Sequence, residues 1–234
     1  MNEKTFVEYA LKLGIKIEEN KLRMLDRYYE LLVEKNKVMN LTNIIEKDDV
    51  YLKHFYDSLT ISMVCDLNSK ESLCDIGTGA GFPGLVLKII YPHLKVVLVD
   101  SLDKRIKFLS DVIKDLGLEN IEAIHVRAED YAKTHRDYYD VVTSRAVARL
   151  SILTELCLPL TKVDGYFISM KSHAKDEINE IGKNLVILNS KIDEIKTFSL
   201  PFEDSIRTLI RIKKERLIDK KYPRDFKEIK RKPL

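Results

Sequence analysis

The chain has few cysteines, few glycines and no long apolar run. Its 234 residues include only three cysteines, which form no CxxC pair and fit no zinc-ligand spacing: Cys65, Cys74 and Cys157. They predict buried thiols in a reducing cytosol, with no disulfide framework and no metal site. No apolar stretch reaches the roughly 18 residues that a membrane-spanning helix needs. The start of the chain, MNEKTFVEYA, carries acids and lacks the apolar core of a secretory signal. We therefore expect a cytoplasmic protein with no membrane partner.

The positive charge is concentrated at one end of the chain. The composition is typical of a folded soluble protein, with 45% hydrophobic and 33% charged residues and a net charge of only +3. From Arg211 to the end, eleven Lys and Arg face four Asp and Glu, which gives this stretch +7 and leaves −4 on residues 1–210. Such a stretch predicts contact with a phosphate backbone, with Tyr222 and Phe226 stacking or anchoring, or else a solvated terminus.

The hydrophobic pattern changes near residue 70. Before it, helical spacing predicts one helix after the candidate N-cap Asn20 and another over about 48–66. On the second helix His54, Asp57 and Ser58 point away from the apolar stripe. After residue 70, short apolar runs alternate with helical segments. The predicted strands are 72–76, 95–99, 121–126, 139–144, 165–170, about 192–199 and 206–212, and the predicted helices are 84–91, 102–116, 147–157 and 174–186.

This alternation predicts an α/β fold with an open, mostly parallel sheet. The last two strands are separated only by a turn around Pro201, so they close the sheet as an antiparallel hairpin. We expect three parts, namely an N-terminal helical extension over 1–69, a Rossmann-like domain over 70–213 and a basic tail over 214–234.

Four of the eight glycines lie in one turn between a strand and a helix, in the segment LCDIGTGAGFPG over residues 73–84. Glycines let the backbone approach a ligand there, and Asp100 ends the next strand, where an acid takes a ribose diol. The segment fits two templates. Gly79, Gly81 and Gly84 match the dinucleotide fingerprint, whereas Asp75 with Gly77, Gly79 and Gly81 matches the S-adenosylmethionine loop.

Charge favours the methyl donor, because an ionised Asp75 attracts a sulfonium or ammonium group and repels a pyrophosphate. The alternatives are an NAD-dependent dehydrogenase and a non-enzymatic RNA-binding module with a nucleotide pocket. The sequence has neither the (N/D)PP(Y/F) tetrapeptide of exocyclic-amine methylation nor the Pro-Cys pair of carbon-5 pyrimidine methylation. Guanine N7 needs neither, since its exposed lone pair attacks a methyl group without losing a proton.

Motifs along nearly the whole chain resemble the bacterial 16S rRNA guanine-N7 methyltransferase G family, also called the glucose-inhibited division protein B family. They are Asn40-Leu-Thr42, His54-Phe-Tyr-Asp57-Ser58-Leu, the glycine segment from Asp75 to Gly84, Asp100 through Arg105 to Phe108-Leu109, Arg127-Ala128-Glu129, Ser144-Arg145-Ala-Val-Ala148, Lys171, Tyr222-Pro-Arg224 and the closing Lys232-Pro233-Leu234. One departure is Asp225, where a glycine often follows Tyr-Pro-Arg.

The resemblance implies a class I methyltransferase fold. It also implies transfer of a methyl group from S-adenosylmethionine to N7 of guanine 527 in 16S rRNA, leaving S-adenosylhomocysteine. The 30S subunit or its precursor would be the partner, and we expect a monomer. Cofactor contacts are expected from Asp75, Gly77, Gly79, Gly81, Phe82, Asp100, Ser101, Ala128, Glu129 and Arg145.

Arg145 is expected at the cofactor mouth toward the substrate, with His54 and Asp57 over the rim as further catalytic candidates. Six residues are candidate RNA contacts: Arg149, Lys171, Tyr222, Arg224, Lys230 and Arg231.

Overall fold

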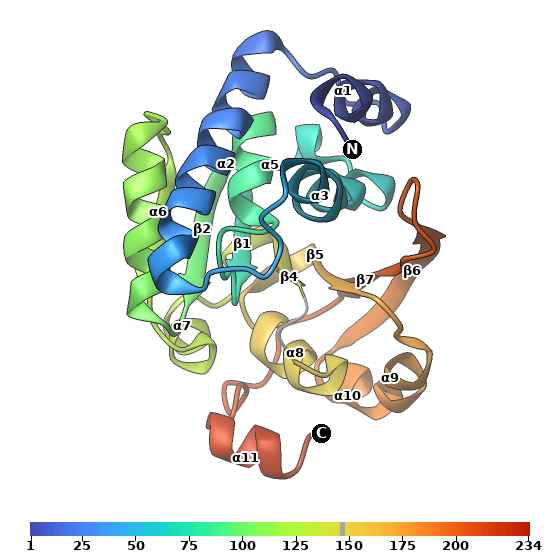
Figure 1. The fold of residues 1–234 in the computed structure, drawn as a ribbon. Helices are drawn as coiled ribbons and strands as arrows, with labels where there is room; N and C mark the ends of the chain where they lie inside the picture. Colours follow the sequence, from blue (N-terminus) through green and yellow to red (C-terminus); the bar gives the residue numbers. More distant parts are fainter. Residues whose placement is uncertain (146–147) are drawn as a thin grey trace.

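A seven-stranded sheet with helices on both faces forms the centre of the computed structural model, which describes residues 1–145 and 148–234 (Figure 1). The strands lie in the order β3-β2-β1-β4-β5-β7-β6. They are β1 (Ser72–Ile76), β2 (Lys95–Asp100), β3 (Ile121–His125), β4 (Tyr139–Arg145), β5 (Thr161–Lys171), β6 (Ser190–Ser199) and β7 (Ile206–Lys214). Strands β1 to β5 pair in parallel, while β7 lies antiparallel to both β5 and β6. The predicted α/β fold and its closing antiparallel hairpin are confirmed.

Alternate residues of each strand point to two separate cores. On β1, Leu73 packs into the first core and Cys74 into the second, and on β4 Val141 and Val142 divide in the same way. This alternation follows from the two-residue repeat of a strand, and burial of both faces explains the continuous apolar runs in the sequence. All three cysteines are buried free thiols, as predicted.

One face carries α5 (Gly84–Ile90) and α6 (Asp103–Asp115), with α2 (Glu19–Met39) packed across both. The helix α1 (Glu3–Lys12) lies beyond them (Figure 1). The other face carries α7 (Ala128–Thr134), α8 (Leu150–Cys157), α9 (Lys175–Glu180), α10 (Gly182–Ile187) and α11 (Phe226–Arg231). The predicted helix over 147–157 is observed as α8, and its first residue, Val147, lies outside the described residues.

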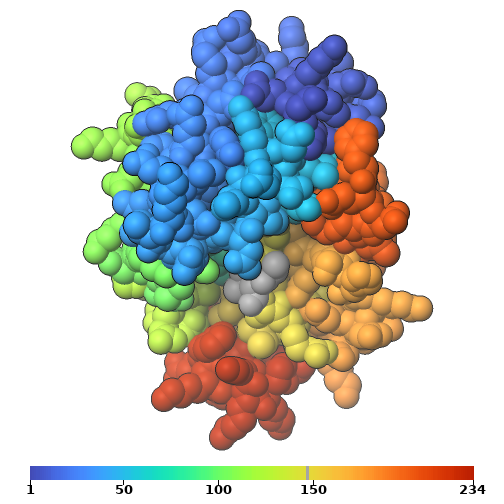
Figure 2. Space-filling model, viewed as in Figure 1, coloured from blue at the N-terminus to red at the C-terminus, as the bar shows by residue number. Residues whose placement is uncertain are grey.

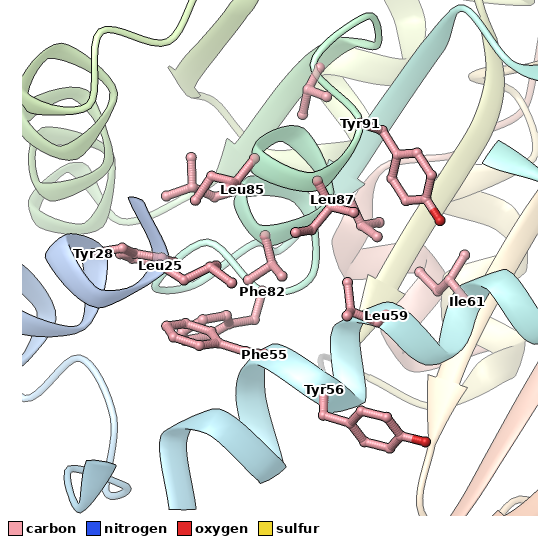
Figure 3. Packing of buried hydrophobic residues seen from close by; sticks show 14 of the residues in the cluster. Leu25, Tyr28, Phe55, Tyr56, Leu59, Ile61, Phe82, Leu85, Leu87 and Tyr91 are labelled. Carbon is pink, nitrogen blue, oxygen red and sulfur yellow. The ribbon is translucent and has the colours of Figure 1, made fainter. Parts of the chain in front are cut away.

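The N-terminal helical residues belong to the same core as the sheet. Figure 3 shows Leu25 and Tyr28 of α2 and Phe55 of the following helical segment packing toward Phe82, in the loop after β1, and Leu85 of α5. The rings of Tyr28 and Phe82 lie 5.5 Å apart between centroids. The helical extension therefore supports the glycine loop directly.

Three local predictions are wrong. The helix α2 begins at Glu19 with Glu18 at its N-cap, so Asn20 lies inside the first turn. The predicted helix over 174–186 is two short helices that meet at Ile181 and Gly182.

The third error concerns the segment predicted as one helix over 48–66. It changes pitch along its length, through α3 (Lys47–Val50), a π-helix (Tyr51–Tyr56), α4 (Asp57–Leu59) and a 3₁₀ turn (Thr60–Met63), and a separate 3₁₀ turn follows (Leu67–Ser69). His54, Asp57 and Ser58, predicted to point away from the apolar stripe, are all buried. Arg145 of β4 and Arg207 of β7 pack against this side of the segment through Asp57.

The basic tail is folded against the second face of the sheet. Ile218, Tyr222 and Ile229 are buried in the second core, and Lys214 is fully buried with its ammonium bonded to Asp137 and to the carbonyls of Leu158 and Thr161. In the described residues no helix combines the length and apolarity that crossing a bilayer requires.

Candidate functional site

A cavity of about 480 Å³ opens at the carboxyl ends of the parallel strands. The glycine loop follows β1, Asp100 ends β2 and Arg145 ends β4, so three predicted elements meet at the edge where open α/β sheets bind ligands. The walls comprise Leu41, Thr42, His54, Ile76, Gly77, Thr78, Gly79, Ala80, Phe82, Val99, Asp100, Ser101, Arg105, Val126, Arg127, Ala128, Glu129, Arg145, Leu156 and Phe226. Predicted residues Asp57, Asp75 and Gly81 are not among these wall residues.

Asp75 lies behind the glycine loop and holds its shape. Its Oδ2 accepts hydrogen bonds from the Thr78 hydroxyl at 2.8 Å and the Gly84 amide at 2.9 Å. A Cβ at Gly84 would come within 2.8 Å of the Asp75 Cβ, so only glycine permits this close return of the loop. Burial raises the pKa of Asp75 to about 6. The structure thus gives Asp75 a role in shaping the loop.

Gly81 also faces away from the cavity. Its φ is +104°, and a Cβ there would lie 2.6 Å from the Tyr28 hydroxyl oxygen. Gly81 therefore permits the glycine loop to pack closely on α2.

Asp100 is a buried carboxylate on the cavity wall, fixed from both sides. Its Oδ2 accepts from the Gly79 amide at 3.0 Å and from the Arg105 guanidinium at 3.1 Å, while Oδ1 accepts from the Leu102 amide at 2.9 Å. A carboxylate offers about four acceptor positions. Asp100 therefore keeps acceptor capacity for a ligand hydroxyl, as its predicted role toward a ribose requires.

Arg145 joins the end of β4 to the N-terminal helical segment. Its guanidinium donates to the Lys53 carbonyl and the Asp57 Oδ2, both at 3.0 Å, and lies 5.1 Å from the centre of the Phe82 ring. Its side chain is 15% exposed and lines the cavity. Arg145 is thus held in one position while facing the space where a ligand would lie.

His54 lies beside Arg145 and is stacked on Phe82 with ring centroids 4.3 Å apart. His54 Nδ1 lies 3.1 Å from both an Arg145 nitrogen and the Lys53 carbonyl. Because a guanidinium only donates and that carbonyl already accepts from Arg145, we assign Nδ1 as the acceptor from Arg145, with Nε2–H donating to the Thr42 hydroxyl at 2.9 Å. Burial, followed by the charge of Arg145, lowers the pKa of His54 to about 3. His54 is therefore a neutral wall residue that positions Arg145 and Thr42.

Asp57 lies behind the wall and bridges two arginines. Its second oxygen, Oδ1, accepts from Arg207 Nε at 3.0 Å. Arg207 belongs to β7, 150 residues away in the chain, and the sequence analysis missed it. An arginine in a strand carries no signal for such a contact, since the order of β5, β7 and β6 in the sheet brings it there.

The candidate RNA contacts fall into two groups. Lys171 pairs with Glu177 at 2.9 Å and bonds the Ala148 carbonyl, and Tyr222 is buried. Arg224 donates two hydrogen bonds to the fully buried Glu155, from Nε at 2.8 Å and from a terminal nitrogen at 2.7 Å. These three residues have internal structural roles.

The second group consists of Arg149, Lys230 and Arg231, which are exposed at the surface. Arg149 pairs with Glu180 at 2.5 Å. Lys230 and Arg231 lie on the basic helix α11.

The cavity combines polar and apolar groups that suit a nucleoside. Its volume lies within the usual range of small-molecule pockets. It combines a fixed carboxylate in Asp100, backbone groups of Gly77 and Gly79, and apolar walls from Val99 and Val126. Among the described residues, no three His, Cys, Asp or Glu side chains gather as a metal site requires.

Known proteins are similar to this chain in sequence. Residues 21–207 match the family described as rRNA small subunit methyltransferase G. The chain belongs to this family. A relative of that name from Bacillus licheniformis is 50% identical over 96% of this chain and 95% of its own length. The relative from Bacillus cytotoxicus is 49% identical over the same shares of the two chains.

Solved structures with low sequence identity share the fold. Precorrin-6y C5,15-methyltransferase from Geobacter metallireducens superposes with a TM-score of 0.52 at 14% identity, covering 68% of this chain and 87% of its own. M. jannaschii TYW2, solved in complex with AdoMet, has a TM-score of 0.50 at 15% identity and covers 63% of this chain and 70% of its own. The sheet is therefore that of the class I methyltransferases, as predicted.

Proposed function

We propose that this protein transfers a methyl group from S-adenosylmethionine to N7 of guanine 527 in 16S rRNA. The observation that carries the proposal is one cavity whose walls contain the glycine loop, Asp100 and Arg145 together. Family membership supports the rRNA substrate, and the AdoMet complex of a protein with the same fold supports the cofactor. The antiparallel β7 between β5 and β6 also favours a methyltransferase sheet over a dinucleotide domain.

The residues of the cavity have separable roles. Asp100 would accept hydrogen bonds from the ribose hydroxyls, and Ala128 and Glu129, at the start of α7, would meet the adenine edge. Gly77 and Gly79 would let the backbone approach the methionine portion. When bound, S-adenosylmethionine supplies an electrophilic methyl group on its sulfonium.

The reaction needs no general base. The N7 lone pair of guanine forms the new carbon–nitrogen bond while the carbon–sulfur bond breaks and its electrons return to sulfur. A neutral His54 with a pKa of about 3 fits this chemistry, since no proton has to be taken up. Catalysis then consists of alignment and electrostatics.

Arg145 is the residue best placed to position the target. Its contacts with Lys53, Asp57 and His54 use three of the five N–H groups of a guanidinium. The remaining donors are available for a guanine carbonyl or an RNA phosphate at the cavity mouth.

The exposed cations Lys230 and Arg231 are proposed contacts to the RNA backbone, and Arg149 is a further one at the surface. A guanine in a loop presents N7 more readily than one in the deep groove of an RNA helix. The 30S subunit or its precursor is the proposed partner. The cytoplasmic location and the monomeric state stay predictions.

Labelled methyl transfer tests the proposal. Purified protein is incubated with labelled S-adenosylmethionine and ribosomal subunits from a strain that lacks the enzyme, and binding of S-adenosylhomocysteine and NAD is measured in parallel. We expect label in 16S rRNA, binding of the homocysteine product and no NAD binding. Two results would overturn the proposal. One is tight binding of NAD with no binding of S-adenosylmethionine or S-adenosylhomocysteine, and the other is label found only in protein.

A further inference from the structure

The C-terminal tail contributes an aromatic side chain to the cofactor cavity. Phe226, the first residue of α11, is one of the wall residues, together with Leu156 of α8. The sequence analysis considered Phe226 as a stacking or anchoring group of the basic tail.

Two ion pairs from neighbouring residues fix Phe226 at the cavity. Arg224, two positions before it, holds Glu155 through two side-chain hydrogen bonds and its own amide, which donates to Glu155 Oε1 at 2.9 Å. Glu155 is fully buried and immediately precedes Leu156. Asp225, directly before Phe226, pairs with Lys133 of α7 at 3.0 Å. The start of α11 is therefore tied to both helices that border this side of the cavity.

Arg136 secures the segment that leads into this anchor. Its guanidinium donates to the carbonyls of Tyr222 and Ile218. Both Tyr222 and Ile218 are buried in the core on this face of the sheet. The tail is thus held at several points between Ile218 and Asp225, directly before α11 begins, and the position of Phe226 follows from it.

The wall around Phe226 belongs to the side of the cavity that is proposed to take the adenine. Phe226, Ala128 at the start of α7 and Leu156 all contribute to that cavity, and α7 and α8 pack on each other. An aromatic ring offers any purine a face or an edge for contact. We propose that Phe226 contacts the adenine base of the bound cofactor, so that the C-terminal tail forms part of the cofactor site. The inference rests on the function proposed above.

Ligand binding to the full-length chain tests this proposal. Dissociation constants for S-adenosylhomocysteine and for adenosine are measured by calorimetry for the wild type, Phe226→Ala, Phe226→Leu and Phe226→Tyr. We expect Phe226→Ala to weaken both ligands by a similar factor of about tenfold, because both carry the same base. Phe226→Tyr keeps the ring and should bind within about twofold of the wild type, with Phe226→Leu in between.

Two further measurements separate contact with the base from a purely structural role. In steady-state methyl transfer, Phe226→Ala should raise KM for S-adenosylmethionine about tenfold while kcat stays within about twofold. Amide hydrogen exchange should show that α11 is still protected in Phe226→Leu. The affinity of this variant then measures the effect of losing the aromatic ring, even if the tail detaches in Phe226→Ala. Phe202→Ala, at an exposed phenylalanine in the turn between β6 and β7, is the matched control and should leave both affinities unchanged.

Each outcome supports or overturns the proposal. Unchanged affinity in Phe226→Ala, or a loss for S-adenosylhomocysteine without a loss for adenosine, would overturn the contact with the base and leave the proposed function standing. If the wild type binds neither ligand, the proposed function fails and this inference fails with it.

Discussion

The two ends of the chain border the same cavity but are held there in different ways. The N-terminal helical segment contributes Thr42 and His54 and is continuous with the core that covers one face of the sheet. The C-terminal tail contributes Phe226 from the six-residue surface helix α11, on the other face. In the space-filling view the N-terminal residues, in blue, and the end of the tail, in red, lie at opposite edges (Figure 2).

The difference suggests that the N-terminal side aligns the reacting groups and that the C-terminal tail binds RNA. At the N-terminal side, the buried Asp57 joins the partly buried Arg145 and Arg207 in one network of ion pairs. Alignment of reacting atoms requires such rigidity. At the C-terminal side, the exposed cations of α11 lie on a short helix that is anchored by the buried Ile229 and by the ion pair of Arg224 with Glu155. Such a surface is suited to binding a long polyanion.

The largest effect is expected at the N-terminal side of the cavity. Arg145→Ala should lower methyl transfer by about two orders of magnitude or more, because it removes the donors at the cavity mouth. Asp57 keeps its bond to Arg207, so the melting temperature should fall by only about 5 °C. The check is single-turnover methyl transfer together with calorimetric melting, with Arg145→Lys as the charge-preserving control. A large loss of melting temperature with activity retained at low temperature would make Arg145 structural.

The anchor of the tail should affect stability more than chemistry. Arg224→Ala leaves the buried Glu155 without its partner, which typically costs about 3–5 kcal/mol and lowers the melting temperature by about 10 °C. The double variant Glu155→Gln with Arg224→Ala removes the stranded charge and should recover part of that loss. Thermal unfolding of the full double-mutant cycle measures this coupling, and strictly additive effects would contradict the anchor.

The cations of α11 should affect RNA binding alone. Replacing Lys227, Lys230 and Arg231 together by alanine should weaken binding to the 16S rRNA loop by about tenfold at low salt. The slope of log affinity against log salt should fall by about 2, and the affinity for S-adenosylhomocysteine should not change.

Three exposed lysines on and after α1 provide the charge-matched control: Lys4, Lys12 and Lys16. Figure 1 shows α1 and α11 at opposite ends of the molecule. An equal loss of RNA affinity in this control would mean that RNA affinity depends on the total positive charge of the protein and that α11 is not a specific contact.

The effect that depends on pH concerns Asp75 behind the glycine loop. Burial raises its pKa in the folded protein to about 6, above the ordinary value of 3.8, so the folded state holds a proton that the unfolded chain has released between these pH values. The stability contributed by that proton is present at low pH and is lost as the pH rises through about 6. Relative to Asp75→Asn, the wild type should therefore lose about 1–3 kcal/mol between pH 4 and pH 6. Urea unfolding of both proteins over this range gives the difference, and a difference independent of pH would contradict the buried position.

The sequence predicts the central strands β1, β2 and β4 well because each is a short, almost continuously buried apolar run. It also places the glycine loop, Asp100 and Arg145 at one edge, since parallel strands end together. It fails where tertiary contacts decide. The contacts of Asp57 with Arg145 and Arg207 depend on the order of the strands, and only the packing of the tail shows that Arg224 binds Glu155.

Mapping the methylated nucleotide tests the central claim most directly. Subunits from a strain lacking the enzyme are incubated with wild type or Arg145→Ala, and N7-methylguanine is located by reduction and strand cleavage. We expect cleavage at guanine 527 of 16S rRNA with the wild type and almost none with Arg145→Ala. Cleavage at another nucleotide, or equal cleavage with both proteins, would contradict the account.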